Sequence, residues 1–376
     1  MEIKSFIENL ESLNVGFYTG VPDSQLKSLC DYLIATYGIN NTHLIAVNEG
    51  NALALASGYH IATGKVPCVY LQNSGLGNIV NPLTSLTHSK VYGIPTVFVV
   101  GWRGQPGVHD EPQHVYMGEI TEKILNDLDL KVIHLTKTST EESLKEALVG
   151  VKESLSEGKS IAFLVSKDAL SSSIKQTYTN ECPLLREHLI QEILAVSKDG
   201  LIVSTTGKTS REVFEVREQR HEGHEKDFLT VGSMGHSSSI ALGLALHQPS
   251  QKVWAIDGDG AVLMHMGAMA LIGERQPKNL IHIVINNGAH ESVGGQPTSN
   301  THLEISKIAK ACGYSVVVSA HNLEEFKRAL SAATHLEGPI FIEMKSAIGS
   351  RDDLGRPTST PSENKKALMS FIKDHQ

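Results

Sequence analysis

The sequence predicts two α/β domains, each built on a doubly wound parallel β-sheet, with no central domain between them. Short apolar segments typical of buried strands alternate with helical segments along both halves of the chain. Polar, glycine-containing turns follow several of these strands, and open parallel sheets bind ligands at that edge. The chain of 376 residues is long enough for two such domains.

The first half, residues 1–167, begins with an amphipathic helix and then alternates strands with helices. Asp23 or Ser24 is placed to cap the helix that runs through Leu29 and Leu33. A helix of small residues, 52–62, follows the second strand. The strands expected in this half are 15–18, 43–47, 67–71, 96–100, 131–135 and 161–165.

Residues 168–183 are the expected linker, because they are rich in serine and threonine and show no sustained period. The second half, residues 184–376, repeats the alternation of strands and helices. Its clearest expected elements are a helix at 184–196 and strands at 201–205, 253–256, 280–285 and 340–344.

Composition and charge exclude several classes of protein. The net charge of −8 gives no support for nucleic-acid or acidic-membrane binding, so local basic groups must meet any anionic substrate. The four cysteines form no CxxC pair, which argues against a zinc site or a disulfide framework. Segment 1–13 does not resemble a signal peptide, and no apolar run approaches the about 20 residues of a membrane span. We therefore expect a cytoplasmic protein.

The strongest chemical signal lies in the β-α-β unit at 253–289. Its first strand leads to Asp259 and its second to Asn287, 28 positions later (287 − 259). Adjacent parallel strands would bring the two side chains together at one edge of the sheet. A carboxylate and an amide oxygen are hard ligands that suit Mg²⁺, which takes its remaining ligands from phosphate and water.

The turn around Asp259 is also suited to a phosphate group. Gly258 and Gly260 let the backbone approach a phosphate closely. The helix expected to start near Ala261 would direct its free N–H groups towards it. Asp257 is either a second acidic ligand or a support for the turn through backbone N–H groups, and we favour the support role.

The sequence Gly258-Asp259-Gly260, 25 further residues and then Asn286-Asn287 resembles the thiamin-diphosphate motif of the decarboxylase and acetolactate-synthase superfamily. The resemblance implies two cofactors, thiamin diphosphate and Mg²⁺. It also implies that Asp259, Asn287 and Ala289 bind the metal.

Glu49 matches a second feature of that superfamily. The sequence Glu49-Gly50-Asn51-Ala52 precedes a helix that ends Ala62-Thr63-Gly64, and the superfamily typically has Glu-x-x-Ala at this place. The resemblance implies that Glu49 is the catalytic carboxylate that contacts the pyrimidine ring of the cofactor. The alternative is a surface glutamate that is favourable at a helix N-terminus.

Two further turns are cofactor-binding candidates. Residues 230–236 are similar to the superfamily's G-S-x-G stretch, which implies that Met234 supports the bent cofactor and that the Gly232 carbonyl holds its amine. Met234 could instead simply fill the core. Thr206 and Gly207 follow an expected strand, and such a strand-to-helix turn can bind phosphate through N–H groups.

The substrate site is less sharply indicated. Residues 101–114 form a polar loop that we interpret as a cover over the substrate, although a solvated loop has the same composition. Residues 345–357 carry two arginines and form either a solvated tail or an anion clamp. Either His109 or His236 is the candidate proton donor. The candidate substrate contacts are Asp23, Ser24, Asn73, Arg103, His109, Lys208, Arg351 and Arg356.

Over essentially its whole length the chain resembles the phosphonopyruvate decarboxylases of that superfamily, through GVPDS, TTGKTSRE and NNGAH-x-SVGGQPT among other segments. The resemblance implies decarboxylation of 3-phosphonopyruvate to phosphonoacetaldehyde and carbon dioxide, a step of phosphonate biosynthesis. Sulfopyruvate decarboxylase is the alternative. It is commonly split into two chains near the linker, so the fused chain favours phosphonopyruvate.

The resemblance also implies how the two halves are used. Residues 1–167 would be the pyrimidine-binding domain and residues 184–376 the diphosphate-binding domain. The cofactor would lie between halves of different subunits, so we expect a homo-oligomer, at least a dimer. A carboligase is disfavoured by the missing central domain and flavin segment, and a non-catalytic thiamin-binding subunit is disfavoured by Glu49.

Overall fold

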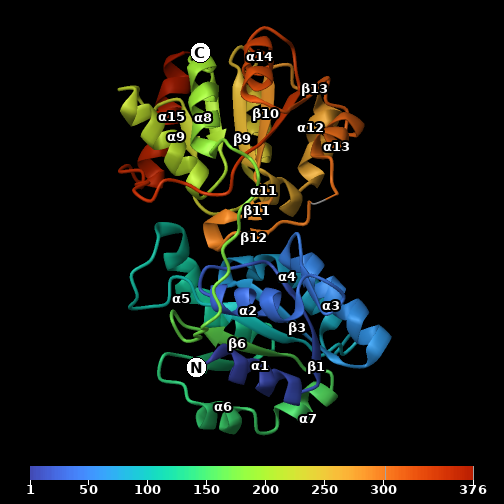
Figure 1. Ribbon diagram of the computed structural model, residues 1–376. Helices are drawn as coiled ribbons and strands as arrows, with labels where there is room; N and C mark the ends of the chain where they lie inside the picture. The colour runs from blue at the N-terminus through green and yellow to red at the C-terminus, as the bar shows by residue number, and fades with distance from the viewer. Residues whose placement is uncertain (301, 376) are drawn as a thin grey trace. The chain divides into compact units, whose positions relative to one another are not determined.

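The chain forms two compact units in the computed structural model, which describes residues 1–300 and 302–375 (Figure 1). Unit 1 comprises Met1–Thr177 and Val293–Pro297, and unit 2 comprises Tyr178–Ser292 and Thr298–Gln376. The change from one unit to the other after Thr177 falls within the segment 168–183, whose composition indicated a linker.

Unit 1 is built on six parallel strands in the order β2-β1-β3-β4-β6-β5. The strands are β1 (Val15–Gly20), β2 (His43–Ile45), β3 (Val66–Gln72), β4 (Val97–Gly101), β5 (Lys131–Leu135) and β6 (Ile161–Val165). The helices are α1 (Ile3–Ser12), α2 (Lys27–Tyr37), α3 (Glu49–Thr63), α4 (Leu76–Pro82), α5 (Pro112–Asp127), α6 (Glu141–Ala147) and α7 (Val151–Ser156), with short turns η1 (Asn73–Gly75) and η2 (Leu83–Thr87).

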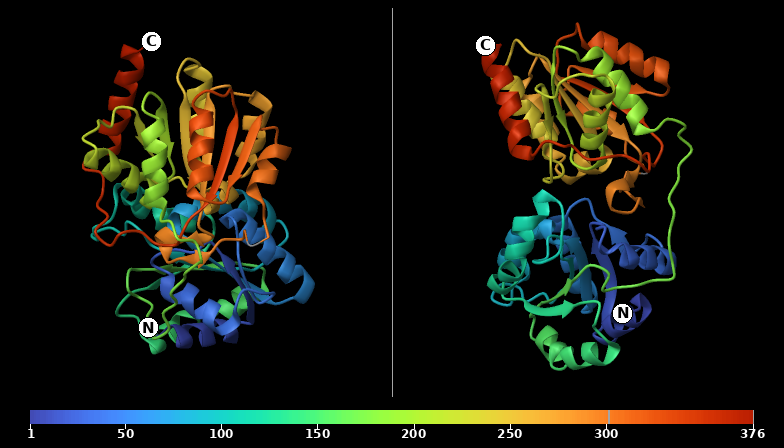
Figure 2. Two further views of the ribbon diagram at one scale, coloured as in Figure 1. Left: turned by 45° about the horizontal axis from the view of Figure 1, so that its top comes forward. Right: turned by 90° about the vertical axis from the view of Figure 1, so that its left-hand side faces the viewer.

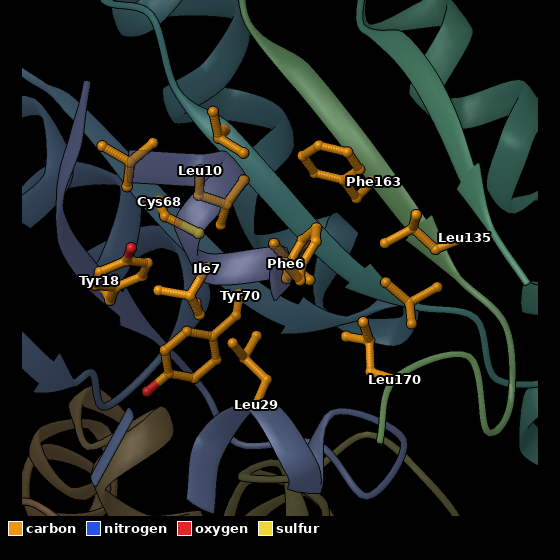
Figure 3. Close-up of a cluster of buried hydrophobic side chains, with 14 of the residues drawn as sticks. Phe6, Ile7, Leu10, Tyr18, Leu29, Cys68, Tyr70, Leu135, Phe163 and Leu170 are labelled. Carbon is orange, nitrogen blue, oxygen red and sulfur yellow. The ribbon is translucent and has the colours of Figure 1, made fainter. Parts of the chain in front are cut away.

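Both faces of this sheet are buried, as the continuous apolar strands predict. Alternate residues of a strand point to opposite faces, so Val99 packs with one set of helices and Val100 with the other. Helices α1, α2, α6 and α7 contribute to the first core, and α3, α4 and α5 to the second. Figure 3 shows the first core, where the rings of Phe6 and Phe163 meet edge to face with centroids 5.1 Å apart.

Unit 2 is built on a second six-stranded parallel sheet in the order β13-β14-β10-β9-β7-β8. The strands are β7 (Leu201–Ser204), β8 (Asp227–Leu229), β9 (Val253–Gly258), β10 (Leu280–Asn286), β13 (Val316–Ala320) and β14 (Ile340–Lys345). The two-residue strand β11 (Ala289–His290) also belongs to unit 2, whereas the two-residue strand β12 (Gln296–Pro297) belongs to unit 1. The helices are α8 (Arg186–Val196), α9 (Lys208–Gln219), α10 (Ser237–His247), α11 (Asp259–Met264), α12 (Gly267–Arg275), α13 (Ile305–Ala311), α14 (Leu323–Ala333) and α15 (Pro361–Asp374), with a short turn η3 (Glu291–Val293).

Helices cover both faces of this sheet as well (Figure 2). Helices α8, α9 and α14 pack on one face, and α10, α12, α13 and α15 pack on the other. The two doubly wound parallel sheets predicted from the sequence are therefore confirmed. No helix among the described residues is both long and apolar enough to cross a membrane.

Two local predictions are wrong. Neither Asp23 nor Ser24 caps α2: the helix begins after Leu26 without a side-chain cap, and the Asp23 carboxylate accepts the N–H of Gln25 instead. The helix expected to start near Ala261 begins close by, at Asp259, but the single helical stretch indicated by the spacing of Leu263, Met266, Met269 and Ala270 is interrupted: α11 ends at Met264, and α12 follows as a separate helix. His265 leaves the helical conformation with φ −134° and ψ 48°, while the apolar spacing continues through the break and so conceals it.

Candidate active site

Glu49 is a buried carboxyl group at the first position of α3, with 5% of its surface exposed. Its neighbour Asn48 caps the helix by accepting the N–H of Asn51 at 2.8 Å. The Glu49 Oε2 atom accepts a hydrogen bond of 2.6 Å from Asn78 Nδ2. Gly75 packs so closely that a Cβ atom there would collide with Glu49 Oε1.

The environment of Glu49 favours its protonated form. Burial raises the pKa of Glu49, and the hydrogen bond from Asn78 offsets this only in part. Among the described residues no cation is paired with this carboxyl group. A buried carboxyl group of this kind can hold or transfer a proton at a nitrogen atom of a bound ring.

Asp23 lies at the same edge of the sheet but is completely buried. It accepts a hydrogen bond of 2.5 Å from Gln72 Nε2 at the end of β3. Gly101, the last residue of β4, leaves the space that the Asp23 carboxylate occupies, because a Cβ atom there would collide with Oδ2. Asp23 thus holds together the ends of three neighbouring strands.

Arg103 joins several of the candidate substrate residues. Its Nε donates to Asp110 Oδ2 at 2.8 Å, and its Nη1 donates to Ser24 Oγ at 3.0 Å. Asn73 Nδ2 donates to the Arg103 carbonyl oxygen at 2.7 Å. His114, in contrast, lies buried on α5, where burial lowers its pKa to about 4 and keeps it uncharged at neutral pH.

A cavity of about 360 Å³ in unit 1 brings basic side chains together. Ser24, Arg103 and His109 were expected from the sequence, and Lys27 and Lys167 were missed. The full lining is Ser24, Gln25, Lys27, Ser28, Arg103, Val108, His109, Asp110, Lys167, Asp168 and Leu170. Lys167 closely follows β6, and this position at a strand end was the available signal.

In unit 2 the sheet brings Asp259 and Asn287 together as the β-α-β prediction requires. Strands β9 and β10 are adjacent and parallel, with Ile285 opposite Gly258. The Asn287 N–H points to Asp259 Oδ1 at 3.4 Å. The other carboxylate oxygen, Oδ2, accepts hydrogen bonds from Thr298 Oγ1 at 2.5 Å and from Asn300 Nδ2 at 2.8 Å.

These residues fit a divalent cation. Asp259 is 1% exposed, and burial raises its pKa to about 6 because the described residues place only neutral donors around it. The Asn287 amide oxygen, which accepts the Ala289 N–H, and the Ala289 carbonyl are further hard oxygen atoms in the same turn. Mg²⁺ needs few protein ligands, and the described residues hold no cluster of three or more histidine, cysteine or acidic side chains.

The turns expected to hold the organic cofactor also gather in unit 2. The Gly232 N–H donates to Thr206 Oγ1 at 2.9 Å, which ties the turn after β8 to the turn after β7. Gly235 has φ 87°, and a Cβ atom there would lie 2.9 Å from the Ala261 carbonyl oxygen. Met234 is half-buried between these glycines. Gly207 has φ 92° and directly precedes α9. At Gly260, a Cβ atom would contact the Thr298 side chain.

The basic residues of unit 2 that were substrate candidates are engaged elsewhere or exposed. Lys208 Nζ lies 3.1 Å from Glu291 Oε1. Arg351 pairs with Glu187, Glu215 and Asp353. Arg356 is exposed on the segment that follows β14. His236 is exposed before α10 and packs against His265.

Asp257 supports the turn, as we favoured from the sequence. Its Oδ1 accepts the Gly258 N–H at 3.0 Å, and its Oδ2 lies 3.5 Å from His282 Nε2 in the interior of the sheet.

A second cavity, of about 950 Å³, opens at the carboxyl ends of β10, β13 and β14, and Asn287 and Lys345 are among its lining residues.

Comparison with known proteins finds a family match in each half of the chain. The model of the thiamine pyrophosphate enzyme N-terminal TPP binding domain matches residues 3–125, and that of the C-terminal TPP binding domain matches residues 205–344. A phosphonopyruvate decarboxylase of Streptomyces viridochromogenes is 35% identical, with 97% of this chain and 94% of the relative covered. One of Streptomyces hygroscopicus is 33% identical over 98% and 93%.

Sulfopyruvate decarboxylases are also similar. The enzyme of Methanosarcina acetivorans is 27% identical, with 85% of this chain and 84% of the relative covered. A sulfopyruvate decarboxylase subunit beta of Methanococcus maripaludis is 35% identical over 50% of this chain and 98% of the subunit.

Proposed function

Because the chain belongs to the thiamine pyrophosphate enzyme family and is one of its decarboxylases, we propose that it converts 3-phosphonopyruvate to phosphonoacetaldehyde and carbon dioxide in phosphonate biosynthesis. The observation that carries the choice of substrate is the nearly full-length similarity to two phosphonopyruvate decarboxylases, at 35% and 33% identity. The sulfopyruvate decarboxylase that covers most of the chain is 27% identical.

The presence of both halves in one chain does not help to choose between phosphonopyruvate and sulfopyruvate as the substrate. A sulfopyruvate decarboxylase without a subunit designation matches 85% of this chain, so enzymes of both substrate classes match across both halves. Contrary to the expectation from the sequence, fusion of the two halves does not favour phosphonopyruvate, and sulfopyruvate remains the second candidate substrate.

We propose that Asp259, Asn287 and the Ala289 carbonyl hold Mg²⁺, and that the metal binds the diphosphate of the cofactor. Thiamin diphosphate, when bound, supplies the electron sink that decarboxylation of a 2-oxo acid needs. Gly258, Gly260 and the turn at Thr206–Gly207 allow a close approach of the diphosphate to the backbone. Gly232 and Met234 would hold and support the remaining part of the cofactor.

Glu49 would hold the ring of the cofactor and exchange a proton with one of its nitrogen atoms. Its raised pKa supports this role, because burial makes the protonated form of the carboxyl group more accessible, and a carboxyl group can then both donate and accept a proton. The tight packing of Gly75 and the hydrogen bond from Asn78 fix the position of its oxygen atoms.

The cavity in unit 1 is the proposed binding place of the phosphonate group. Arg103, Lys27 and Lys167 supply positive charge around it, partly balanced by Asp110 and Asp168 of the same lining and by Asp31, which pairs with Lys27, and Ser24 supplies a hydroxyl donor. Asp110 holds the Arg103 guanidinium in place through Nε. A doubly charged phosphonate benefits more from this concentration of cations than a sulfonate of single charge does.

We further propose that the enzyme is a homo-oligomer, at least a dimer, whose active sites combine Glu49 of one subunit with Asp259 of another. Mixing the inactive variants Glu49→Ala and Asp259→Ala tests this arrangement. If subunits share sites, reassembled mixtures regain part of the activity, because some sites contain neither substitution. If each chain forms its own site, the mixture stays inactive.

The decisive experiment on the substrate compares carbon dioxide release from phosphonopyruvate, sulfopyruvate and pyruvate, with thiamin diphosphate and Mg²⁺ present. We expect the highest kcat/KM with phosphonopyruvate and release at least about 10²-fold slower by the Glu49→Ala control. A higher value with sulfopyruvate would assign the chain to the second substrate. Release from none of the three would contradict the proposed reaction.

A further inference from the structure

A buried ion-pair cluster adjoins the proposed metal site in unit 2. The cluster consists of Arg186, Lys208, Glu212 and Glu291 and contacts Asn287. The Glu291 side chain is 7% exposed and the Arg186 side chain 8%. Glu291 Oε2 accepts a hydrogen bond of 2.8 Å from Asn287 Nδ2.

Glu291 determines which way the Asn287 amide faces. A carboxylate only accepts hydrogen bonds, so the NH₂ group of the amide must point to it. The Asn287 Oδ1 atom then points away, and it accepts the Ala289 N–H at 3.0 Å. Rotating the amide by half a turn would place its oxygen against the Glu291 carboxylate and would cost both contacts.

The cluster holds the Glu291 carboxylate between two cations. Arg186 lies between two carboxylates, with Nε 2.6 Å from Glu212 Oε2 and Nη1 3.0 Å from Glu291 Oε2. Lys208 Nζ approaches Glu291 Oε1 at 3.1 Å.

We propose that Glu291 is a positioning residue for the divalent cation: it locks the Asn287 amide so that Oδ1, rather than Nδ2, is available beside Asp259. Arg186 and Lys208 act one step further away, by holding the Glu291 carboxylate. This inference rests on the proposed Mg²⁺ site and is independent of which 2-oxo acid is decarboxylated. Residues that orient metal ligands typically contribute about 10- to 100-fold to metal affinity.

The chain provides a matched control in Glu212. Glu212 pairs with the same arginine as Glu291, is also buried and has no hydrogen bond to Asn287 among the described contacts. Glu291→Gln and Glu212→Gln each remove one negative charge from the surroundings of Arg186. Only Glu291→Gln gives the Asn287 amide a neighbour that can donate as well as accept, so only this variant permits both amide orientations.

The measurement is the binding of thiamin diphosphate to the full-length protein at increasing Mg²⁺ concentrations, followed by calorimetry or tryptophan fluorescence, with thermal melting of each variant alongside. We expect Glu291→Gln to raise the Mg²⁺ concentration for half-maximal binding by roughly 10- to 100-fold. Glu212→Gln should lower the melting temperature by a similar amount and leave the Mg²⁺ requirement nearly unchanged. Equal Mg²⁺ requirements in the two variants would overturn the inference.

Exchanging the amide and the carboxylate between positions 287 and 291 tests whether the contact between these two side chains matters. Asn287→Asp alone sets two carboxylates against each other and should weaken Mg²⁺-dependent binding. Combined with Glu291→Gln, it restores a hydrogen bond with the donor and acceptor reversed, and the pair again consists of one carboxylate and one amide. We expect the double variant to need less Mg²⁺ than Asn287→Asp, and failure to recover would also overturn the inference.

The same titration separates the inference from the proposed function. If the unmodified protein shows no Mg²⁺-dependent binding of thiamin diphosphate, the proposed metal site fails, and the inference fails with it. If that binding is normal and only the Glu291 effect is missing, the metal site stands and the positioning role alone is rejected.

Discussion

The two units share one topology and differ in the chemistry at the carboxyl edge of their sheets. Unit 1 has the order β2-β1-β3-β4-β6-β5, and unit 2, counted along the chain in the same way, has β8-β7-β9-β10-β14-β13. In both, the first strand lies between the second and third, and the fourth strand separates the third from the last two. The same backbone plan therefore offers the same edge positions twice.

The residues at those positions differ. In unit 1 the carboxylates follow the first and second strands, as Asp23 and Glu49, and Arg103 follows the fourth. In unit 2 the third and fourth strands lead to Asp259 and Asn287. The fold supplies an edge where side chains converge, and the side chains decide what binds there.

The buried carboxyl groups differ in the charges around them. Glu49 and Asp259 accept hydrogen bonds from neutral groups, and burial raises the pKa of both. Glu291 has two cations beside it, and its pKa is lowered. Glu49 and Asp259 thus lack the neighbouring cations that Glu291 has. This is expected where a bound cofactor or metal ion provides the positive charge.

The largest effect should come from Glu49. Replacing it with alanine removes the group that would exchange a proton with the cofactor, so we expect kcat to fall by about 10²- to 10⁴-fold. Binding of thiamin diphosphate should change far less, because the metal and diphosphate contacts belong to unit 2. Steady-state kinetics and a binding titration measure the two quantities separately. If Glu49→Ala kept a kcat near that of the unmodified enzyme, Glu49 would not be a catalytic group. The sheet edges of units 1 and 2 would then not differ in catalytic role.

Asp259 should show the reverse pattern, with an effect on binding and stability. Its folded pKa of about 6 lies above the ordinary value of 3.8, so the folded protein holds the extra proton between these values. The cofactor-free protein therefore loses stability as pH rises through this window, by an order of a few kcal/mol at most. An asparagine at position 259 does not titrate, so it causes no such loss of stability as pH rises.

Thermal melting of the unmodified protein and Asp259→Asn from about pH 4.5 to about pH 8 measures this difference. Without ligands, the variant should become the more stable protein above about pH 6. Mg²⁺ with thiamin diphosphate should stabilise only the unmodified protein, increasingly as pH rises, because the metal binds the ionised carboxylate. Identical pH profiles for the two proteins would show that Asp259 does not titrate as its burial requires.

A smaller effect is expected at Gly75, which tests whether packing positions Glu49. A Cβ atom at Gly75 would collide with the Glu49 carboxylate, whereas one at Gly77 meets no atom within 4 Å. Gly75→Ala should lower kcat by about 10- to 100-fold, as displacements of a catalytic group commonly do. Gly77→Ala is the matched control, since it makes the same change in the same segment. Similar kcat values for the two variants would contradict the positioning role of Gly75.

All the main strands except β8 and β13, and the meeting of Asp259 with Asn287, could be predicted because they depend on local patterns. Each buried strand is a continuous apolar run, and the β-α-β unit makes its two strands neighbours. The sequence spacing and the flanking strands were thus sufficient to predict that the two side chains converge.

The partners of charged residues could not be predicted in this way. Arg186 and Glu291 are 105 positions apart, and Arg351 and Glu187 are 164 apart. The Asp353 partner of Arg351 lies two positions away, but Glu187 and Glu215 of Arg351 and Glu291 of Lys208 are distant in the sequence. Lys208 and Arg351 were therefore interpreted as substrate contacts. The break at His265 was missed because the apolar period continues through it, and Lys167 was missed because a single lysine after a strand has no distinctive pattern.

The smallest expected effect is at Lys167, and it tests whether the cations of unit 1 recognise the phosphonate group. Lys167 is exposed at the rim of the cavity, where an ion pair contributes up to about 1 kcal/mol. Lys167→Ala should therefore raise KM for phosphonopyruvate a few-fold, should leave kcat nearly unchanged, and should have no effect on KM for pyruvate, which lacks the second anionic group. Lys123→Ala, which removes an exposed lysine of α5 paired with Asp127, is the control. Because salt screens such pairs, the difference between Lys167→Ala and the unmodified enzyme should shrink as ionic strength rises. An equal rise in KM for both acids would place Lys167 at the shared 2-oxo acid group and leave the phosphonate to Arg103 and Lys27.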